Sequence, residues 1–299
     1  MIQTSSNWAF KQYERVRDSL PHSTFPKQSK QIKSLSAITD KFDVFLLDAF
    51  GVLNIGNTAI VTARQRVSAL QASGKKVMVL TNGATLASGQ ALAKYRRLGY
   101  RFCEDDIISS RATLKLALEK MRQGYWGVMA ADCSKIEELQ VKSIILKNNS
   151  ADFDKVCGFI LLSSLQWTNE NQALLIESLR NNPRPVIVGN PDIVAPHEDG
   201  LSLEPGFFAH QLTQLLGIEP IFFGKPFNNI FDLAFTRLNK IEKNRVLMVG
   251  DTLHTDILGG KSYGLTTALV TDFGVYSNEN VTQFTNISGI NPDYIMPTI

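Results

Sequence analysis

Cysteine is scarce in this chain, and long hydrophobic runs are missing from it. The three cysteines, Cys103, Cys133 and Cys157, are odd in number, widely spaced and in no CxxC pair. This argues against a disulfide framework or a zinc site and indicates the reduced thiols of a cytoplasmic protein. No apolar segment approaches the length of a membrane span, and residues 1–12 lack the basic patch and apolar core of a signal peptide.

An excess of one charge is also missing. The 31 lysines and arginines oppose 28 aspartates and glutamates, which gives a formal net charge of +3. So small an excess gives no support for nucleic acid or a membrane as a partner. With 44% hydrophobic and 20% charged residues the composition is that of a soluble globular protein, and 299 residues favour two domains over one.

Several common catalytic signatures are absent as well. The chain has no GxGxxG, HExxH or GxSxG motif, and Gly260-Lys261-Ser262 fails as the end of a P-loop because the first glycine would fall on Thr255. Scattered histidines favour ordinary hydrogen-bonding roles, least so for His254, which lies close to Asp251 in the chain. The other histidines are His22, His197 and His210.

Short apolar runs alternate with helical patterns along most of the chain. Continuous apolar runs that end in turn residues are typical of buried parallel strands, and the intervening patterns fit crossover helices. The alternation predicts a doubly wound, Rossmann-like parallel sheet. Strands are expected at 44–47, 77–80, 126–130, 156–162, 186–188, 221–223, 246–249 and 267–270, and helices at 59–72, 86–98, 110–121, 134–139, 169–180, 229–239 and 255–263.

Polar residues of complementary type follow three of these strands. Asp48 ends the first, Thr81-Asn82 ends the second, and Gly250-Asp251 ends the strand that begins at Val246. Because the carboxyl ends of parallel strands share one edge of a sheet, these groups and Lys225 are expected around one pocket. Two acids can hold Mg²⁺, and the metal and the lysine can together stabilise the charge of a phosphoryl group in transfer.

Four segments in order resemble the motifs of the haloacid dehalogenase superfamily. They are Asp48-Ala49-Phe50-Gly51-Val52, Leu80-Thr81-Asn82, Gly224-Lys225-Pro226 and the segment from Gly250 to Asp256. The long insert before the third motif resembles the α/β cap of the class IIA branch, which contains sugar-phosphate and p-nitrophenyl-phosphate phosphatases similar to NagD. The resemblance implies a core of residues 43–83 plus 207–299 and a cap of residues 84–206, with hinge crossings near Gly83 and Pro205-Gly206.

The resemblance also implies a role for each motif residue. Asp48 would be the nucleophile that forms an aspartyl-phosphate, and Asp48, the backbone carbonyl of Phe50 and Asp251 would bind Mg²⁺. Asp256 would position the metal-binding loop. The phosphoryl oxygens would be held by Thr81, Asn82, Gly83 and Lys225, and the cap residues Asn190 and Asp192 could contact a small phosphorylated metabolite.

Phe50 departs from the family pattern. Phosphatases of this family usually carry there a second aspartate, which serves as general acid and then as base. A positioned acid/base is typically worth about 10²–10⁴ in rate, so proton transfer should suffer while metal binding through a backbone carbonyl should not. Two alternatives stay open: a phosphomonoester phosphatase selective for good leaving groups, and a protein that only binds a phosphorylated ligand or a protein partner.

Residues 1–42 lie outside these motifs. Ser5 or Ser6 could cap a short helix that Pro21 ends, and the Lys-, Gln- and Ser-rich segment after Pro26 is typical of a loop. We expect an N-terminal appendage that packs either on the core or on a second copy in a homodimer.

Overall fold

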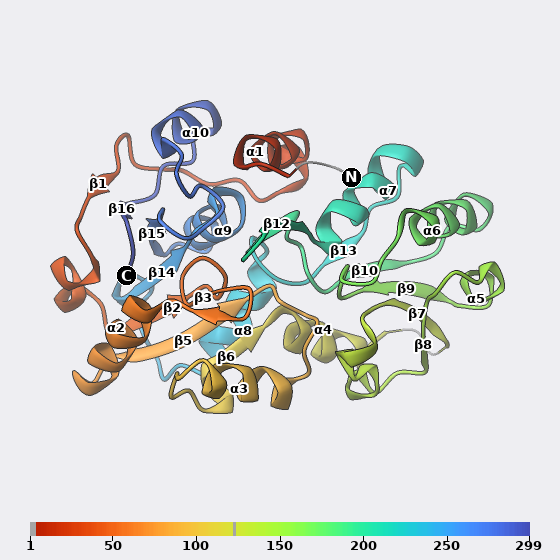
Figure 1. The fold of residues 1–299 in the computed structure, drawn as a ribbon, viewed down its shortest axis with the longest axis horizontal. Helices are drawn as coiled ribbons and strands as arrows, with labels where there is room; N and C mark the ends of the chain where they lie inside the picture. The colour runs from red at the N-terminus through yellow and green to blue at the C-terminus, as the bar shows by residue number, and fades with distance from the viewer. Residues whose placement is uncertain (1–3, 122–123) are drawn as a thin grey trace.

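The fold is built on two parallel sheets, which lie in the left and right halves of Figure 1. A computed structural model describes residues 4–121 and 124–299. The larger sheet has seven strands with all neighbours parallel, which confirms the predicted doubly wound α/β class. In sheet order they are β1 (Lys30–Gln31), β16 (Tyr294–Met296), β15 (Thr266–Val270), β14 (Val246–Gly250), β2 (Val44–Leu47), β5 (Lys76–Thr81) and β6 (Ile107–Ser109).

Strand β2 is buried on both faces, as its unbroken apolar run predicts. Phe45 and Leu47 pack with α2 (Val61–Ala72) and α3 (Ser88–Arg97), whereas Val44 and Leu46 pack with α8 (Asn228–Thr236) on the other face. Because successive side chains of a strand alternate, two helical layers enclose the sheet. This sandwich fixes where β2 ends, and therefore where Asp48 begins.

The smaller sheet has five strands and its own hydrophobic clusters. Helices α6 (Asn169–Asn181) and α7 (Pro205–Leu216) pack on one of its faces and α4 (Ser110–Leu118) on the other. The sheet order is β13 (Ile221–Phe222), β10 (Val186–Val188), β9 (Gly158–Leu161), β7 (Trp126–Met129) and β8 (Ser143–Ile145), with α5 (Ser150–Asp154) following β8. This is the α/β cap that the sequence predicts.

An antiparallel hairpin reaches from the small sheet to the large one. Its strands are β11 (Val194–His197) and β12 (Gly200–Leu203), and Glu198 at its tip accepts hydrogen bonds from the backbone N–H of Asn57 and from Thr58 Oγ1. Those two residues belong to a second short hairpin, β3 (Asn54–Ile55) with β4 (Thr58–Ala59), which follows Asp48 in the core. The two hairpins therefore tie the cap to the core beside the end of β2.

The membership of the sheets differs from the boundaries that the sequence suggests. Strand β6 belongs to the large sheet and β13 to the small one, so we propose that the cap runs from about residue 110 to about residue 222. The hinge expected at Pro205-Gly206 falls at the start of a helix. These residues begin α7, and a Cβ on Gly206 would lie 2.1 Å from the carbonyl oxygen of Pro191, so the segment is packed helix and not a linker.

The N-terminal segment packs on the core of its own chain. Helix α1 (Ser6–Arg15) begins at Ser5, whose hydroxyl accepts a hydrogen bond from Trp8 N, and it buries Phe10 and Tyr13. Strand β1 adds to the edge of the large sheet beside β16. The predicted appendage thus contributes both a helix and an edge strand.

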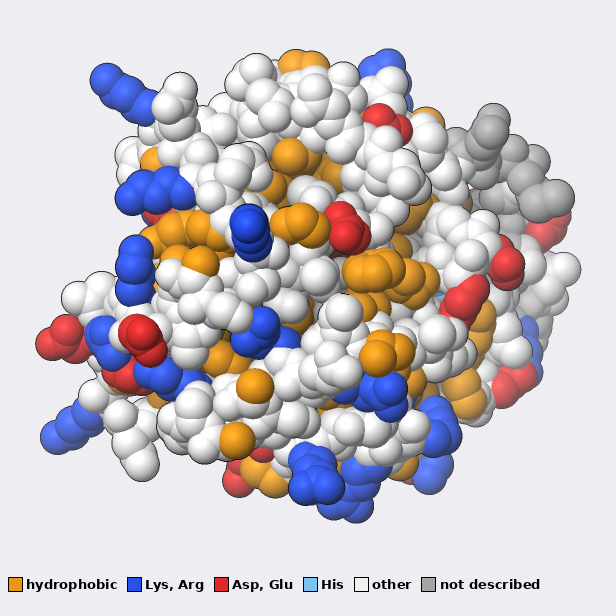
Figure 2. All heavy atoms as spheres, turned by 60° about the vertical axis from the view of Figure 1, so that its left-hand side comes forward, with side chains coloured by type: hydrophobic (Ala, Val, Ile, Leu, Met, Phe, Trp, Pro, Cys, Tyr) orange, Lys and Arg blue, Asp and Glu red, His pale blue; other side chains and the backbone are white. Residues whose placement is uncertain are grey.

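The remaining helices are short. Residues 253–262 form a π-helical turn, η8 (Leu253–Ile257), followed by α9 (Leu258–Ser262), and α10 is Val281–Ser288. None of the helices in the described parts of the chain has the length and apolar character needed to cross a bilayer. On the face shown in Figure 2, basic, acidic and hydrophobic side chains are interspersed, in keeping with the small net charge.

Candidate active site

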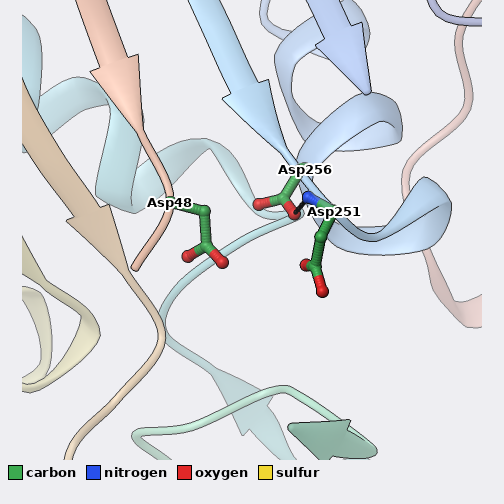
Figure 3. Close-up of side chains that lie close together, drawn as sticks. All are labelled: Asp48, Asp251 and Asp256. Atoms are coloured by element: carbon green, nitrogen blue, oxygen red, sulfur yellow. Dashed lines mark hydrogen bonds between the residues drawn. The ribbon is translucent and has the colours of Figure 1, made fainter. Parts of the chain in front are cut away.

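Three buried carboxylates converge at the carboxyl edge of the large sheet (Figure 3). Asp48 follows β2, Asp251 follows β14, and Asp256 lies in η8; they are 7%, 2% and 1% exposed. A carboxylate oxygen from each lies within 4.8 Å of the others. Strands β2 and β14 are paired with Leu47 opposite Val249, so their ends are level, which is how the two strand-end acids meet.

Glycine is required around these acids because they leave no room for a side chain. A Cβ on Gly250 would lie 2.0 Å from Cγ of Asp256, and one on Gly274 would lie 2.3 Å from Cβ of Asp251. Gly51 has a φ of +77°, and a Cβ there would lie 2.5 Å from Oδ2 of Asp251. Gly51 was part of the predicted motif, whereas Gly274, which follows β15, was not foreseen.

Asp256 is fully engaged by the protein itself. Its Oδ2 accepts hydrogen bonds from the backbone N–H groups of Asp251 and Thr252, each at 3.0 Å, and its Oδ1 accepts one from Lys225 Nζ at 2.6 Å. Both oxygens are thus used to fix the loop and the lysine. The arrangement supports the positioning role expected of Asp256.

Lys225 joins Asp48 to Asp256. Its ammonium is 1% exposed and donates to Oδ1 of both carboxylates. Burial alone would lower the pKa of Lys225, but the charges of Asp256, Asp48 and Asp192 outweigh burial and raise it. Lys225 therefore stays charged at any physiological pH.

One lysine does not balance the acids around it. Burial raises the pKa of Asp48 to about 7 against the attraction of Lys225, and burial together with Asp256 and Asp48 raises the pKa of Asp251 well above its usual value. Oxygen donors in surplus, buried and close together, fit a hard divalent cation. With Asp256 occupied, Asp48 and Asp251 are the residues available to such an ion.

The residues after β5 lie beside this cluster. Thr81 is buried, and its Oγ1 accepts a hydrogen bond from Gly83 N at 3.1 Å. The Asn82 amide donates to the carbonyl of Lys225 at 2.9 Å and to Oδ1 of Asp192 at 2.8 Å, and its oxygen accepts from Lys225 N at 2.7 Å. The Asn82 side chain thus connects the second and third motifs to the cap, and only its backbone N–H is left to face a phosphate.

The two predicted cap residues have different surroundings. Asn190 is buried in the turn, where it donates to Glu204 and accepts from the backbone N–H of Asp192. Asp192 lines the cavity above Asp48, and burial raises its pKa well above the usual value. Asp192 thus faces the candidate site, whereas Asn190 shapes the turn that carries it.

Phe50 lines the cavity at Asp48, and its ring contacts two residues that the sequence did not single out. Lys94 Nζ on α3 lies 4.4 Å from the centroid of the Phe50 ring, and the His197 ring on β11 lies 5.4 Å away. Burial lowers the pKa of Lys94 to about 8. Lys94 reads in the sequence as an ordinary helix cation, so only the tertiary contact reveals it.

His254 points to α1 rather than to the carboxylates. Its Nε2 pairs with Glu14 Oε1 at 2.5 Å, and its ring stacks on Tyr13 with centroids 5.0 Å apart. Its proximity to Asp251 in the chain is therefore not proximity in the site. His254 fastens the loop after β14 to the N-terminal helix.

The space above Asp48 is small. The cavity has a volume of about 10 Å³, room for about one water molecule, and is roofed by Val194, Ala195 and Pro196 of β11. The other lining residues are Asp48, Phe50, Asp192, Lys225, Asp251, Thr252 and Thr255. A phosphate ester cannot enter unless the hairpin moves.

Known proteins share this fold and these segments. A family model for haloacid dehalogenase-like hydrolases matches residues 45–143, and a HAD-hydrolase-like model matches residues 222–299. Phosphoglycolate phosphatase 2 of Arabidopsis thaliana is 28% identical in an alignment that covers 89% of this chain and 94% of that protein.

Two solved structures extend the similarity to the cap. A "possible sugar phosphatase" of Cytophaga hutchinsonii is 29% identical, with a TM-score of 0.79 over 90% of this chain and 98% of that one. The p-nitrophenyl phosphatase of Archaeoglobus fulgidus is 26% identical, with a TM-score of 0.70 over 86% and 97% of the two chains. This chain belongs to the haloacid dehalogenase superfamily, in its class IIA branch of NagD-like and p-nitrophenyl phosphatase-like proteins.

Proposed function

We propose that this protein is a Mg²⁺-dependent phosphomonoester phosphatase that acts on a small metabolite in the cytoplasm. The observation that carries the proposal is the set of three buried carboxylates around one buried lysine at the end of β2. The names of its relatives, which include sugar, phosphoglycolate and p-nitrophenyl phosphatases, support the same reaction class. A sugar phosphate or a similar small ester is the proposed substrate.

Asp48 is the proposed nucleophile. One of its oxygens accepts a hydrogen bond from Lys225. Attack on phosphorus would break the bond to the leaving oxygen and form an aspartyl-phosphate, which water would then hydrolyse to regenerate the carboxylate. Lys225 holds Asp48 in place for this attack and offsets the charge of the phosphoryl group.

The remaining motif residues would orient the phosphoryl group. The Thr81 hydroxyl and the backbone N–H of Asn82 lie at the end of β5 beside Asp48, where they can donate to phosphoryl oxygens. The N–H of Gly83, also expected to contribute, donates to Thr81 Oγ1 and would have to exchange that bond for a phosphoryl oxygen. A divalent cation held by Asp48, the carbonyl of Phe50 and Asp251 would supply charge neutralisation at the same oxygens. Through its hydrogen bonds, Asp256 positions Lys225 to offset the charge of the phosphoryl group and positions the loop of Asp251 to bind the cation.

The cap hairpin must open for turnover. The cavity of about 10 Å³ under β11 admits no ester, so substrate entry requires the cap to move away from the core and closure to exclude water. Crystal structures with and without a phosphate analogue test this. An identical, sealed arrangement of hairpin and core in both would contradict a lid.

Phe50 keeps a second function open, namely binding of a phosphorylated ligand or a protein partner without turnover. The phenyl ring cannot transfer a proton, and its neighbour Lys94 carries no carboxylate that could replace the missing acid. This observation favours slow or leaving-group-selective chemistry and, at the limit, none.

Phosphate release from a panel of phosphorylated metabolites and p-nitrophenyl phosphate decides between the two functions. We expect Mg²⁺-dependent release that Asp48→Asn abolishes, because that variant lacks the nucleophile. Asp199→Asn, at the exposed tip of the cap hairpin, is the matched control and should keep wild-type rates. Tight binding of an ester with no release of phosphate over hours would support the binder instead.

A further inference from the structure

Lys94 is a buried cation without an anionic partner. Its side chain lies on α3, the residue is 9% exposed, and among the described residues its Nζ makes no ion pair and no hydrogen bond. Other buried cations of the protein are paired: Lys225 with Asp48 and Asp256, and Arg111 with Glu138 at 2.9 Å. A buried charge normally has such a partner, because desolvation is otherwise uncompensated. The face of the Phe50 ring compensates the desolvation of the Lys94 ammonium only in part.

The position of Lys94 links it to the proposed active site. Phe50, whose ring Lys94 contacts, lines the same cavity as Asp48 and Lys225. Helix α3 begins at Ser88, five residues after Gly83 of the proposed phosphate-binding segment Thr81–Gly83. A substrate group that extends from the phosphate past the Phe50 ring therefore arrives at the Lys94 ammonium.

Arg97, one turn further along α3, adds positive charge near Lys94. His197 lies on the same aromatic ring, but burial lowers its pKa, so it adds no charge near neutral pH. The nearby acid, Glu198, is held by Asn57 and Thr58 in the hairpin contact. An aspartate in place of Phe50 would have neutralised Lys94, whereas the phenyl ring leaves its charge for a ligand.

We propose that Lys94 binds a second anionic group of the substrate, so that the preferred substrates are phosphomonoesters that carry a carboxylate. This rests on the proposed phosphatase function and specifies its substrate class. The carboxylate would pair with the ammonium at the Phe50 ring while the phosphate lies at Asp48. Binding of the substrate would then also compensate the buried charge of Lys94.

The test compares two esters of similar size, 2-phosphoglycolate with a carboxylate and ethyl phosphate without one. Wild type should prefer 2-phosphoglycolate by at least about tenfold in kcat/KM. Lys94→Met should lower that preference to about threefold or less, mainly through KM of the carboxylate ester, and Lys94→Arg should retain most of it. Arg96→Met, an exposed cation of the same helix, is the control and should leave the preference unchanged.

Equal rates for the two esters in wild type, or an unchanged preference in Lys94→Met, would overturn the inference and leave the phosphatase function intact. If neither ester is hydrolysed, phosphate release from p-nitrophenyl phosphate decides on the proposed function, and calorimetry with phosphonoacetate and ethylphosphonate decides on Lys94 alone. Selective loss of phosphonoacetate binding in Lys94→Met would then support the anion subsite. If Lys94→Met does not fold, Lys94→Gln takes its place, and a preference as large as that of wild type in it would refute the proposal.

Discussion

Replacing Asp251 by asparagine should stabilise the metal-free protein. Asp251 is 2% exposed and is not paired with Lys225, so its charge adds to those of Asp48 and Asp256 without a cation of its own. An asparagine keeps both present contacts: its oxygen can accept from Val275 N, and its amide can donate to Thr252 Oγ1. The substitution therefore removes charge and little else.

The neighbouring Asp48 gives the scale of the effect. Burial raises its pKa from 3.8 to about 7, and about three pKa units correspond to roughly 4 kcal/mol at a pH above 7. The pKa of Asp251 is raised for the same reasons, burial first and then Asp256 and Asp48. A carboxyl with a raised folded pKa stabilises the fold below its unfolded pKa and loses that contribution as pH rises through the folded value. Stability without metal should hence fall between about pH 4 and pH 7, and less so in Asp251→Asn.

Urea titrations at pH 7.5 in chelator and in excess Mg²⁺ measure the effect. We expect Asp251→Asn to exceed wild type by about 1–4 kcal/mol in chelator, whereas Mg²⁺ should stabilise wild type alone, by about 2.7 kcal/mol at 100 times its Kd. Calorimetry on the variant should show Mg²⁺ binding largely lost. Lower stability of Asp251→Asn in chelator would refute the reasoning that the acids carry surplus charge, and unchanged Mg²⁺ affinity would refute the ligand role.

The matched controls should change stability in the opposite direction. Asp256→Asn removes the negative partner of Lys225 and turns its NH2 group either to the Lys225 ammonium or to the two backbone donors, so a loss of about 3–5 kcal/mol is expected. Asp106→Asn breaks the ion pair with Lys76, whose Nζ lies 2.6 Å from Oδ1, and should also destabilise the protein. Gains in all three variants would mean that asparagine stabilises for reasons unrelated to charge.

Three further predictions concern proton transfer, pH and the N-terminal helix. Rapid mixing with p-nitrophenyl phosphate should give a burst of p-nitrophenol and then a slow steady state, since no base at position 50 activates water against the aspartyl-phosphate. Phe50→Asp should abolish the burst, and equal rates on alkyl and aryl esters without a burst would contradict this prediction. Burial lowers the pKa of His210 to about 4. The free energy of unfolding should therefore hold above pH 6.5 and fall by about 3 kcal/mol as the pH decreases towards 4, because the buried ring must then be protonated. Urea titrations of His210→Phe should lack that loss. Tyr13→Phe leaves the buried N–H of Ile193 without its acceptor and should lower the free energy of unfolding by about 1–3 kcal/mol in urea titrations. An unchanged free energy would mean that a water molecule accepts this hydrogen bond instead.

The large sheet and the ends of its central strands were predictable because local signals agree with the global fold. Continuous apolar runs such as Val44–Leu47 ended in polar residues, and in parallel strands those ends must meet at one edge. The sequence therefore predicted which acids and which lysine would meet. Their hydrogen bonds now support distinct positions for Asp251 and Asp256, although both are aspartates of one short motif.

The cap hairpin was not predictable from its own residues. Pro196 in β11 and the glycine that begins β12 indicate loop, and the strands exist because they pair with each other and pack between cap and core. For a related reason strand β6 was not predicted at all, and β13 was expected in the core, whereas it pairs with β10 of the small sheet. Which sheet a strand of two or three residues joins is decided by partners distant in sequence, here Val79–Thr81 and Ile187-Val188.

Phe50 shows most clearly how a local anomaly acquires meaning from tertiary contacts. Read along the chain, it is a missing acid. In the fold Phe50 lines the proposed catalytic cavity and its ring also contacts Lys94, so the residue that removes a proton donor also leaves a buried ammonium without an ion pair among the described residues. The two consequences are coupled, because a carboxylate at position 50 could transfer protons or pair with Lys94, but pairing would lower its pKa and weaken it as an acid. Proton transfer by the enzyme and recognition of an anionic substrate therefore compete for the same position, and in this chain the aromatic residue favours recognition.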